Sequence, residues 1–358
     1  METTRYNRQI ILSEVGNSGQ QKLQKAKVLI IGVGGLGSSI LPYLAAAGIG
    51  EIGIMDDDTV DITNLQRQVI YKSTSVGKSK VLEAAAMALA LNPSIKINAI
   101  SKKLDSKNAI SLFEQYDIMV DATDNLNTKY LINDACCVTK KPFVYGSIFK
   151  FEGQVSVFNF NDGPTYRCLF PEIANDSSNC NEKGVLGISV GIIGMLQANE
   201  VLKMVLEIGE ILSGKLLVYN MLNNEQQKFE FCKIVTNTID LKAFKNKYTS
   251  GKSSIFEILS AEALEQINNP QVVFLDVRNW DEIPKIDIEN SIQIPLDNLE
   301  DELWKLNVGT TVFVFCQSGI RSKKAVEILI KHNFKNTKSI IGGVKSLEKY
   351  PHAVLDTF

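Results

Sequence analysis

The segment "VLIIGVGGLGSSI", residues 28–40, places a glycine-rich turn between an apolar strand and a helix. Gly32, Gly34 and Gly37 would let backbone N–H groups approach a phosphate closely, and the helix that follows adds its positive end. Asp56 closes the next apolar run, where a carboxylate can accept hydrogen bonds from ribose hydroxyls. The turn predicts a nucleotide site, but alone it fits a nicotinamide or flavin enzyme equally well.

Short apolar runs alternate with helical segments from Lys27 to about Pro171, which predicts an α/β fold with a doubly wound, Rossmann-like, mostly parallel sheet. Period-two patterning at 151–160 and a hairpin-like pair further on predict an antiparallel extension of that sheet. An apolar helix is expected from about 185 to 206. The expected strands are 27–32, 51–56, 95–101, 117–123, 142–147, 151–160, 215–222 and 226–235, and the first two helices are expected at 38–48 and 79–92.

The alternation of helix and strand stops and then resumes, which indicates two domains in a chain of 358 residues. Residues 236–254 are polar, Lys-rich and weakly patterned, so we predict a linker there. The boundaries expected are therefore 1–235 for the larger domain and 255–358 for a second, smaller α/β domain.

Composition excludes several classes of protein. A formal net charge of −2 argues against a nucleic-acid partner or an anionic membrane surface. The longest uncharged run, 184–199, contains Ser, Gln and several Gly, so we expect a buried helix and no membrane span. The N-terminus shows no export signal, and six scattered cysteines favour reduced thiols and a cytoplasmic location.

Charged residues follow the predicted strands in "DDDTVDITNLQRQVIY", "VGKSK" and "DATDN". A triphosphate that loses pyrophosphate needs Arg and Lys to stabilise the developing charge, and a carboxylate to hold Mg²⁺. Arg67, Lys80 and Asp124 match that need. The alternative is that they are ordinary solvated loop residues.

Residues 5–235 resemble the MoeB/ThiF-type adenylyltransferases of the ubiquitin-activating superfamily, through "RYNRQI", "GVGGLG", "DDDTVDITNLQRQ", "VGKSK", "DATDN", "FEGQVSVF", "YRCLFPE" and "NCNEKGVLGISVG". The resemblance implies that ATP is used and that Mg²⁺ lies at Asp124. It implies a homodimer in which Arg8 reaches the phosphates of the neighbouring subunit. The residues implied to bind ATP are Gly34, Gly35, Asp56, Asn64, Arg67, Lys80, Asp124 and Asn125.

The family adenylates the C-terminal glycine of a ubiquitin-like protein, and a carboxylate needs no general base to attack ATP. Cys180 stands where the family carries a cysteine on a mobile crossover loop, so the resemblance implies a reactive thiol there. Members usually bind structural zinc with two Cys-x-x-Cys pairs. Here Thr165 stands where the first pair should have the partner of Cys168, and Val235 stands where the second pair should have the partner of Cys232. Two single cysteines cannot build the usual site, so we expect no zinc site.

In "FCQSGIRSKKAVEI", Cys316 follows an apolar run and Arg321 lies five positions later. A tight loop that turns N–H groups inward, with a helix beginning near Ser322, would lower the pKa of a thiol and would equally stabilise a persulfide. A phosphatase loop usually has five residues between its cysteine and its arginine. The four residues between Cys316 and Arg321 therefore favour a sulfur-transfer loop over a phosphate-binding loop. The alternative is a buried cysteine beside a surface arginine.

Residues 253–358 resemble a rhodanese domain, through "ILSAEALEQI", "VVFLDVRNWDE", "SIQIPLDNL", "CQSGIRS" and "IIGGVKSLEKY". The resemblance implies that Cys316 accepts sulfane sulfur with Arg321 beside it, and that Asp276 and Arg278 support the loop. Leu347 stands where the family usually has an aromatic residue.

Together the two ends predict an adenylyltransferase with sulfurtransferase activity. ATP and Mg²⁺ would activate a sulfur-carrier protein ending in Gly-Gly, and the Cys316 persulfide would attack the acyl-adenylate to yield a thiocarboxylate. Cys180 would hold the carrier as an acyl intermediate. We expect a donor such as a cysteine desulfurase, and a role in molybdopterin or thiamine biosynthesis. A non-catalytic carrier-binding scaffold and a nicotinamide-dependent oxidoreductase remain as alternatives.

Overall fold

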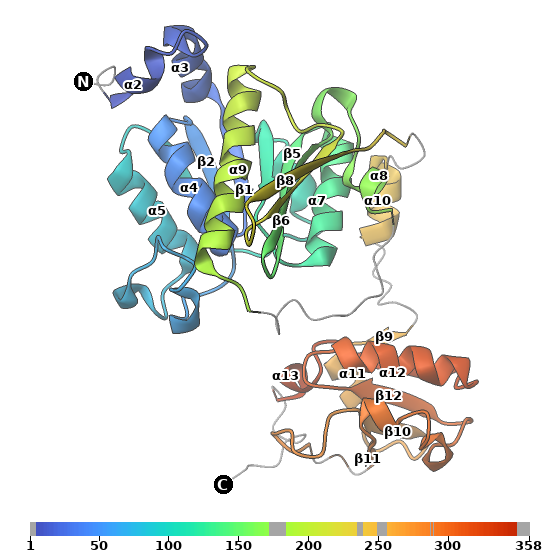
Figure 1. Ribbon diagram of the computed structural model, residues 1–358. Coiled ribbons are helices and arrows are strands. Elements are labelled where there is room, and N and C mark those ends of the chain that lie inside the picture. Colours follow the sequence, from blue (N-terminus) through green and yellow to red (C-terminus); the bar gives the residue numbers. More distant parts are fainter. Residues whose placement is uncertain are drawn as a thin grey trace. The chain divides into compact units, whose positions relative to one another are not determined.

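The computed structural model describes residues 5–171, 184–234, 239–248, 256–286, 288 and 290–348. The chain divides into two compact units, Met1–Ser250 and Gly251–Phe358. Figure 1 shows a mixed sheet with helices on both faces in the first unit and a smaller sheet with its own helices in the second.

The sheet of the first unit has eight strands in the order β3-β2-β1-β4-β5-β6-β7-β8. Strands β3 to β5 in this order run parallel, and β6, β7 and β8 extend the sheet with antiparallel pairs. The predicted doubly wound sheet with an antiparallel extension is therefore confirmed. The strands are β1 Lys27–Ile31, β2 Glu51–Met55, β3 Lys96–Ile100, β4 Ile118–Asp121, β5 Phe143–Phe149, β6 Glu152–Phe158, β7 Lys215–Asn220 and β8 Glu225–Glu230.

Alternate side chains of the central strands enter two separate cores. Val28 and Ile30 of β1 pack into one cluster with α4, α5 and α9, whereas Leu29 and Ile31 pack into a second cluster with α6, α7, α8 and α10. Successive side chains of a strand point to opposite faces, so an uninterrupted apolar run fits a strand covered on both sides. The helices are α2 Asn7–Ile10, α3 Gly16–Lys25, α4 Gly35–Ala47, α5 Lys80–Leu91, α6 Ala109–Phe113, α7 Leu126–Thr139, α8 Tyr166–Leu169, α9 Gly187–Leu206 and α10 Leu241–Tyr248, and the 3₁₀ helices are η1 Ile62–Asn64, η2 Ser73–Ser75 and η3 Phe160–Asp162.

Helix α9 is long and apolar enough to cross a membrane by length and composition alone, yet half of its apolar window is buried inside the protein. It packs against α4, β5 and β6. A Cβ atom at Gly194 would lie 2.8 Å from the backbone oxygen of Leu36 on α4, so the two helices approach closely. Helix α9 is therefore a core element, as predicted for this segment.

One segment differs from the sequence expectation. Residues 241–248, within the predicted linker, form α10, and the Phe244 side chain is 1% exposed. The Tyr248 hydroxyl and the Lys247 ammonium donate to Asp134 on α7 at 2.8 and 2.9 Å. Helix α10 therefore belongs to the first unit.

The second unit contains a five-stranded parallel sheet in the order β11-β10-β12-β13-β9. Its strands carry apolar residues toward both faces, and two buried clusters form its core. This arrangement confirms the predicted smaller α/β domain. Its elements are β9 Glu257–Ile258, β10 Val272–Asp276, β11 Ser291–Gln293, β12 Thr311–Phe315, β13 Thr337–Ile340, α11 Ser260–Leu264, α12 Ile320–Lys331, α13 Val344–Leu347, η6 Leu296–Asn298 and η7 Leu303–Lys305.

Candidate active site

A cavity of about 680 Å³ lies where the parallel strands β1, β2, β3 and β4 end. Ligand pockets typically measure roughly 300–1,000 Å³, so the volume suits a nucleotide. In open α/β sheets such a crevice at the carboxyl ends of the strands is the usual ligand site. All eight residues predicted to bind ATP line it, namely Gly34, Gly35, Asp56, Asn64, Arg67, Lys80, Asp124 and Asn125.

The glycine turn is held in place by its neighbours. Gly32 has a φ of +92°, a conformation that favours glycine, and a Cβ atom at Gly37 would lie 2.1 Å from the Gly32 oxygen. The Val33 N–H donates to Asp56 Oδ2 at 2.8 Å, and the buried Tyr71 hydroxyl donates to the Val33 carbonyl oxygen at 2.8 Å. The two peptide groups that flank Val33, one on each side of its Cα, are thus both held in place.

The two predicted cations are oriented by nearby oxygen atoms. Lys80 is the first residue of α5, its side chain is 7% exposed, and its Nζ lies 2.8 Å from Asp58 Oδ2. Arg67 Nη1 donates to the Thr63 carbonyl oxygen at 2.9 Å. Both side chains line the cavity, so a phosphate group bound there would meet two positive charges.

The acidic side of the cavity contains carboxylates from two loops. Asp124 is exposed, and within the part of the chain that the structure describes it has no hydrogen-bond partner. Asn125 caps α7, accepting from the Thr128 N–H at 3.0 Å. Carboxylate oxygens from Asp56, Asp57 and Asp58 lie within 4.8 Å of one another. Oxygen ligands of this kind are those that Mg²⁺ prefers, so the residues present fit such an ion.

The sequence reasoning missed several lysines that line the cavity, among them Lys102, Lys103 and Lys150. Lys102 and Lys103 follow β3, and their position after a predicted parallel strand is the signal that would have found them. Buried Lys129 donates to Asp121 Oδ2 at 2.9 Å and to the Thr123 and Gly146 carbonyl oxygens at 2.8 and 3.0 Å. Asp121 is thus engaged in a buried ion pair.

Arg8, Cys180 and the cysteines at the expected zinc positions are not among the described residues that line this cavity. Arg8 is an exposed residue of α2 and is not among the described residues that line the cavity of its own chain. Cys180 lies outside the described residues. Cys168 Sγ accepts from the N–H groups of Thr165 and Ile234 at 3.4 and 3.2 Å, whereas Cys232 is exposed. The expectation of no zinc site stays a prediction.

Cys316 lies in the second unit, where β12 ends and the loop to α12 begins. It is 1% exposed, and its Sγ accepts from the Gly319 N–H at 3.2 Å. Gly319 has a φ of +92°, and a Cβ atom at Gly343 would lie 2.0 Å from the Cys316 oxygen. Glycine at both positions therefore lets the backbone close tightly around the sulfur.

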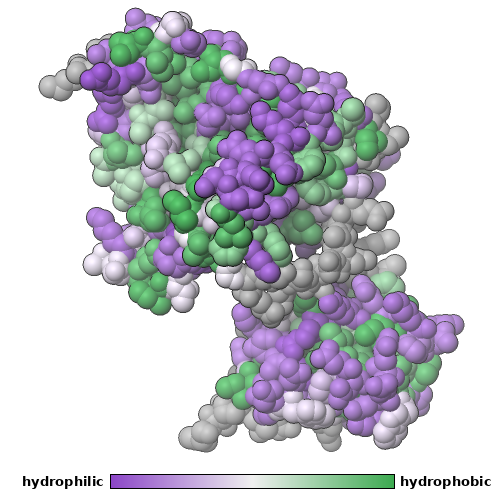
Figure 2. Space-filling model, viewed as in Figure 1, coloured by the Kyte–Doolittle hydropathy of each residue, from purple (hydrophilic) through white to green (hydrophobic). Residues whose placement is uncertain are grey.

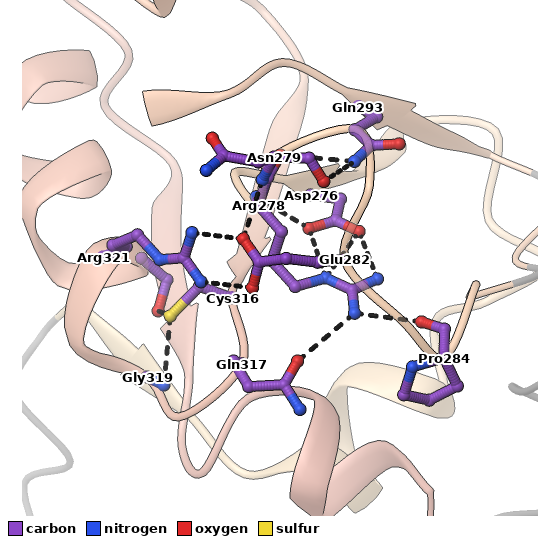
Figure 3. Close-up of polar contacts among 11 residues, drawn as sticks. Asp276, Arg278, Asn279, Glu282, Pro284, Gln293, Cys316, Gln317, Gly319 and Arg321 are labelled. Atoms are coloured by element: carbon purple, nitrogen blue, oxygen red, sulfur yellow. Dashed lines mark hydrogen bonds and ion pairs between the residues drawn. The ribbon is translucent and has the colours of Figure 1, made fainter. Parts of the chain in front are cut away.

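Two arginines contact this loop, and each is bound to a carboxylate (Figure 3). Arg321 donates to both oxygens of Glu282, at 2.5 and 2.6 Å. Arg278, 1% exposed, pairs with Asp276 at 2.7 Å and also donates to Gln317 Oε1 at 3.4 Å. Arg278 and Asp276 therefore brace the loop, while the Arg321 guanidinium is directed at Glu282.

The fold and the two sites define a class: a nucleotide-dependent activating enzyme joined to a sulfur-transfer domain. Residues 6–238 match the ThiF family, and residues 259–349 match the rhodanese-like domain. The chain therefore belongs to the ThiF family and carries a C-terminal rhodanese-like domain, which confirms both resemblances.

Similar proteins match nearly the whole chain. A probable molybdopterin-synthase adenylyltransferase of Pyropia yezoensis is 41% identical over 96% of this chain and 93% of its own length. An adenylyltransferase and sulfurtransferase MOCS3 of Aedes aegypti is 38% identical over 96% and 86%, respectively. This chain is likewise an adenylyltransferase with a sulfurtransferase domain, as predicted.

Among solved structures, E. coli MccB crystallised with ATP matches with a TM-score of 0.58. The match has 24% identity and covers 64% of this chain and 72% of that chain. At this identity the likeness supports the fold of the first unit alone.

Proposed function

We propose that the first unit adenylates the C-terminal glycine of a ubiquitin-like sulfur-carrier protein and that the second unit supplies the sulfur. The observation that carries the proposal is the convergence of the glycine turn, Arg67, Lys80 and Asp124 on one cavity. A carboxylate oxygen of the carrier would attack the α-phosphorus of ATP, and pyrophosphate would leave. Arg67 and Lys80 would stabilise the charge that develops on the phosphates.

A magnesium ion, when bound, would neutralise phosphate charge, and Asp124 is our candidate to hold it. Its exposed carboxylate lines the cavity with no partner in the described residues. Asp56 is less available, because its two oxygens already accept from the Val33 and Asp58 N–H groups at 2.8 and 2.9 Å. Asp58 is engaged by Lys80.

Sulfur transfer would begin on Cys316, whose sulfur already accepts a backbone N–H. A terminal persulfide sulfur would attack the acyl carbon, AMP would leave, and an acyl disulfide would form. Attack of a thiolate on Cys316 Sγ would then release the carrier as a thiocarboxylate. Cys180 is our candidate for this thiol or for another acyl intermediate, and an external dithiol would reduce the resulting disulfide.

A homodimer would bring Arg8 of one subunit to the phosphates bound by the other. Arg8 is exposed and unattached to the cavity of its own chain, which supports a role across an interface. Figure 2 shows hydrophobic surface over α5 and α9 in the first unit, where Leu82, Leu89 and Ile188 are 61%, 41% and 65% exposed. Exposed apolar surface of this kind is typical of protein interfaces.

Molybdopterin synthase is the substrate that the names of the relatives support, in preference to a thiamine-pathway carrier. A cysteine desulfurase remains our candidate donor. We also propose a cytoplasmic location, which the free thiols of Cys136, Cys137, Cys168, Cys232 and Cys316 support.

The test is ATP–pyrophosphate exchange with a molybdopterin-synthase small subunit ending in Gly-Gly. Asp124→Ala should abolish exchange, while Cys316→Ala should leave exchange intact and abolish thiocarboxylate formation. Glu114→Ala is a matched control, because Glu114 is an exposed carboxylate of the first unit outside the cavity. Equal loss of exchange in the Asp124 and Cys316 variants would contradict the proposed division of labour.

A further inference from the structure

The Cys316 loop comprises residues 316–321, all of which the structure describes, and Arg321 is its only cationic side chain. Glu282 binds this arginine. Its two carboxylate oxygens lie 2.5 and 2.6 Å from Nη1 and Nη2 of Arg321, a bidentate geometry that Figure 3 shows edge to edge. The Asn279 N–H donates to the same carboxylate at 2.9 Å. Three donors therefore fix Glu282 beside the loop.

The second arginine at this loop is neutralised as well. Arg278 binds both oxygens of Asp276, at 2.9, 3.0 and 2.7 Å, and its remaining nitrogen donates to the Pro284 carbonyl oxygen at 3.0 Å. The sulfur of Cys316 contacts the Gly319 N–H and the Ser322 hydroxyl, at 3.2 and 3.7 Å, and neither group is charged. Each of the two arginines at the loop is thus paired with one carboxylate, so the charges of these two ion pairs cancel.

The two pairs differ in what a ligand can reach. Arg278 is 1% exposed and braces the loop from inside, whereas the Arg321 and Glu282 side chains are 33% and 26% exposed. The guanidinium holds the pKa of the Glu282 carboxyl below its usual range, so Glu282 is ionised at neutral pH. A sulfur donor that approaches from solvent therefore meets the Arg321 guanidinium already paired with the Glu282 carboxylate.

From this geometry we propose that Glu282 is a specificity-determining residue, which discriminates against dianionic sulfur donors such as thiosulfate and favours persulfides. The inference rests on the proposed role of Cys316 as the sulfur acceptor.

The chemistry of the two donor classes explains the discrimination. With thiosulfate, the Cys316 thiolate attacks the outer sulfur, the S–S bond to sulfite breaks, and sulfite leaves as a dianion. With a persulfide R–S–SH, the thiolate attacks the terminal sulfur, R–S⁻ leaves, and the proton stays on the transferred sulfur. Only the first reaction brings two negative charges to the loop, so only it needs a free cation there.

The experiment measures sulfur loading of Cys316 in the full chain, by cyanide-released thiocyanate and by intact mass. Thiosulfate and cysteine persulfide, which carries at most one net negative charge, serve as the two donors, and the readout is the ratio of their kcat/KM values. Glu282→Gln frees Arg321 and should raise the thiosulfate-to-persulfide ratio at least about tenfold. Glu282→Asp keeps the charge and should stay near the wild-type ratio.

The double variant E282Q/R321M identifies the cause, because it removes the freed cation and should return the ratio toward wild type. Glu302→Gln is the matched control, since Glu302 pairs with Lys305 elsewhere on the surface of the same unit. An unchanged ratio in Glu282→Gln, or an equal rise in the double variant, would overturn the inference. Failure of both donors to load wild-type Cys316 would instead overturn the proposed function.

Discussion

The Lys129 ammonium lies 2.9 Å from the Asp121 carboxylate, and the two side chains are 6% and 0% exposed. The same ammonium lies 5.0 Å from the centre of the Tyr145 ring and binds two backbone oxygens. It thereby ties the end of β4 to β5 and to the loop that carries Asp124. Replacement by Met would leave a buried carboxylate without its counter-charge.

We therefore expect Lys129→Met to lower the free energy of unfolding of the first unit by about 3–5 kcal/mol. Urea denaturation of the full chain measures this change. Lys96→Met is the control, because the Lys96–Glu51 pair is 64% and 20% exposed and should contribute less than about 1 kcal/mol. Equal effects of the two substitutions would show that burial does not set the strength of the Lys129 pair.

Lys80→Met should lower ATP–pyrophosphate exchange by about 100-fold or more, the usual cost of removing a donor to developing charge. The side chain lines the cavity and Asp58 already orients it. Lys80→Arg retains the charge and should keep a larger part of the exchange rate. Near-wild-type exchange in the Met variant would remove Lys80 from the site.

Phe244→Ala should destabilise the first unit by about 3–5 kcal/mol, because the ring is buried on α10 and its centre lies 4.8 Å from the centre of the Tyr248 ring. Leu241→Ala in the same helix should have a small effect, since Leu241 is 44% exposed. Urea unfolding followed by far-ultraviolet circular dichroism distinguishes the two. Indistinguishable variants would indicate that residues 241–248 behave as linker in solution.

The Glu282–Arg321 pair predicts a pH dependence of stability. The hydrogen bond from Arg321 lowers the folded-state pKa of Glu282, so its contribution is fully present above the unfolded-state value, roughly 4.3. The contribution is lost as the pH falls through the lower folded-state pKa. Unfolding free energies of wild type and Glu282→Gln should therefore differ at pH 7 and converge once the pH falls below the folded-state pKa of Glu282, and a constant difference would contradict this assignment.

Thiol reactivity should follow burial in the first unit. Burial raises the pKa of Cys137 to about 12 and that of Cys136 well above the usual thiol range, so neither forms thiolate at neutral pH. Cys232 is exposed. Peptide mapping after brief alkylation should find Cys232 modified well before Cys136 and Cys137, and modification of Cys136 in the native protein would contradict the packing described here.

The parallel strands, the first helices and the residues that line the cavity were predictable because each leaves a local signal. An apolar run followed by glycine, or by an acidic residue, marks the strand ends that form the cavity. The lysine at 129 was not recognised, since its partner Asp121 lies eight positions away and only the folded backbone buries both. A buried lysine and a solvated one look alike in sequence.

Helix α10 was missed for a related reason. Its eight residues include three lysines and one asparagine, and only Phe244 is buried. One apolar anchor gives too little periodicity for a prediction, and its docking depends on Asp134 of α7, which binds Lys247 and Tyr248. The role of Glu282 likewise could not be predicted from the sequence, because only the fold brings the loop after β10 next to Arg321 at the beginning of α12.

The hydrogen bonds from Asp56 and Tyr71 to the two peptide groups that flank Val33 have a thermodynamic consequence. A turn already held in its binding conformation has little backbone entropy left to lose when a nucleotide arrives. The free energy of ATP binding should therefore be set mainly by the contacts between ATP and the protein, with little loss of backbone entropy in the turn. Amide hydrogen exchange at Val33 should accordingly be slow even without nucleotide.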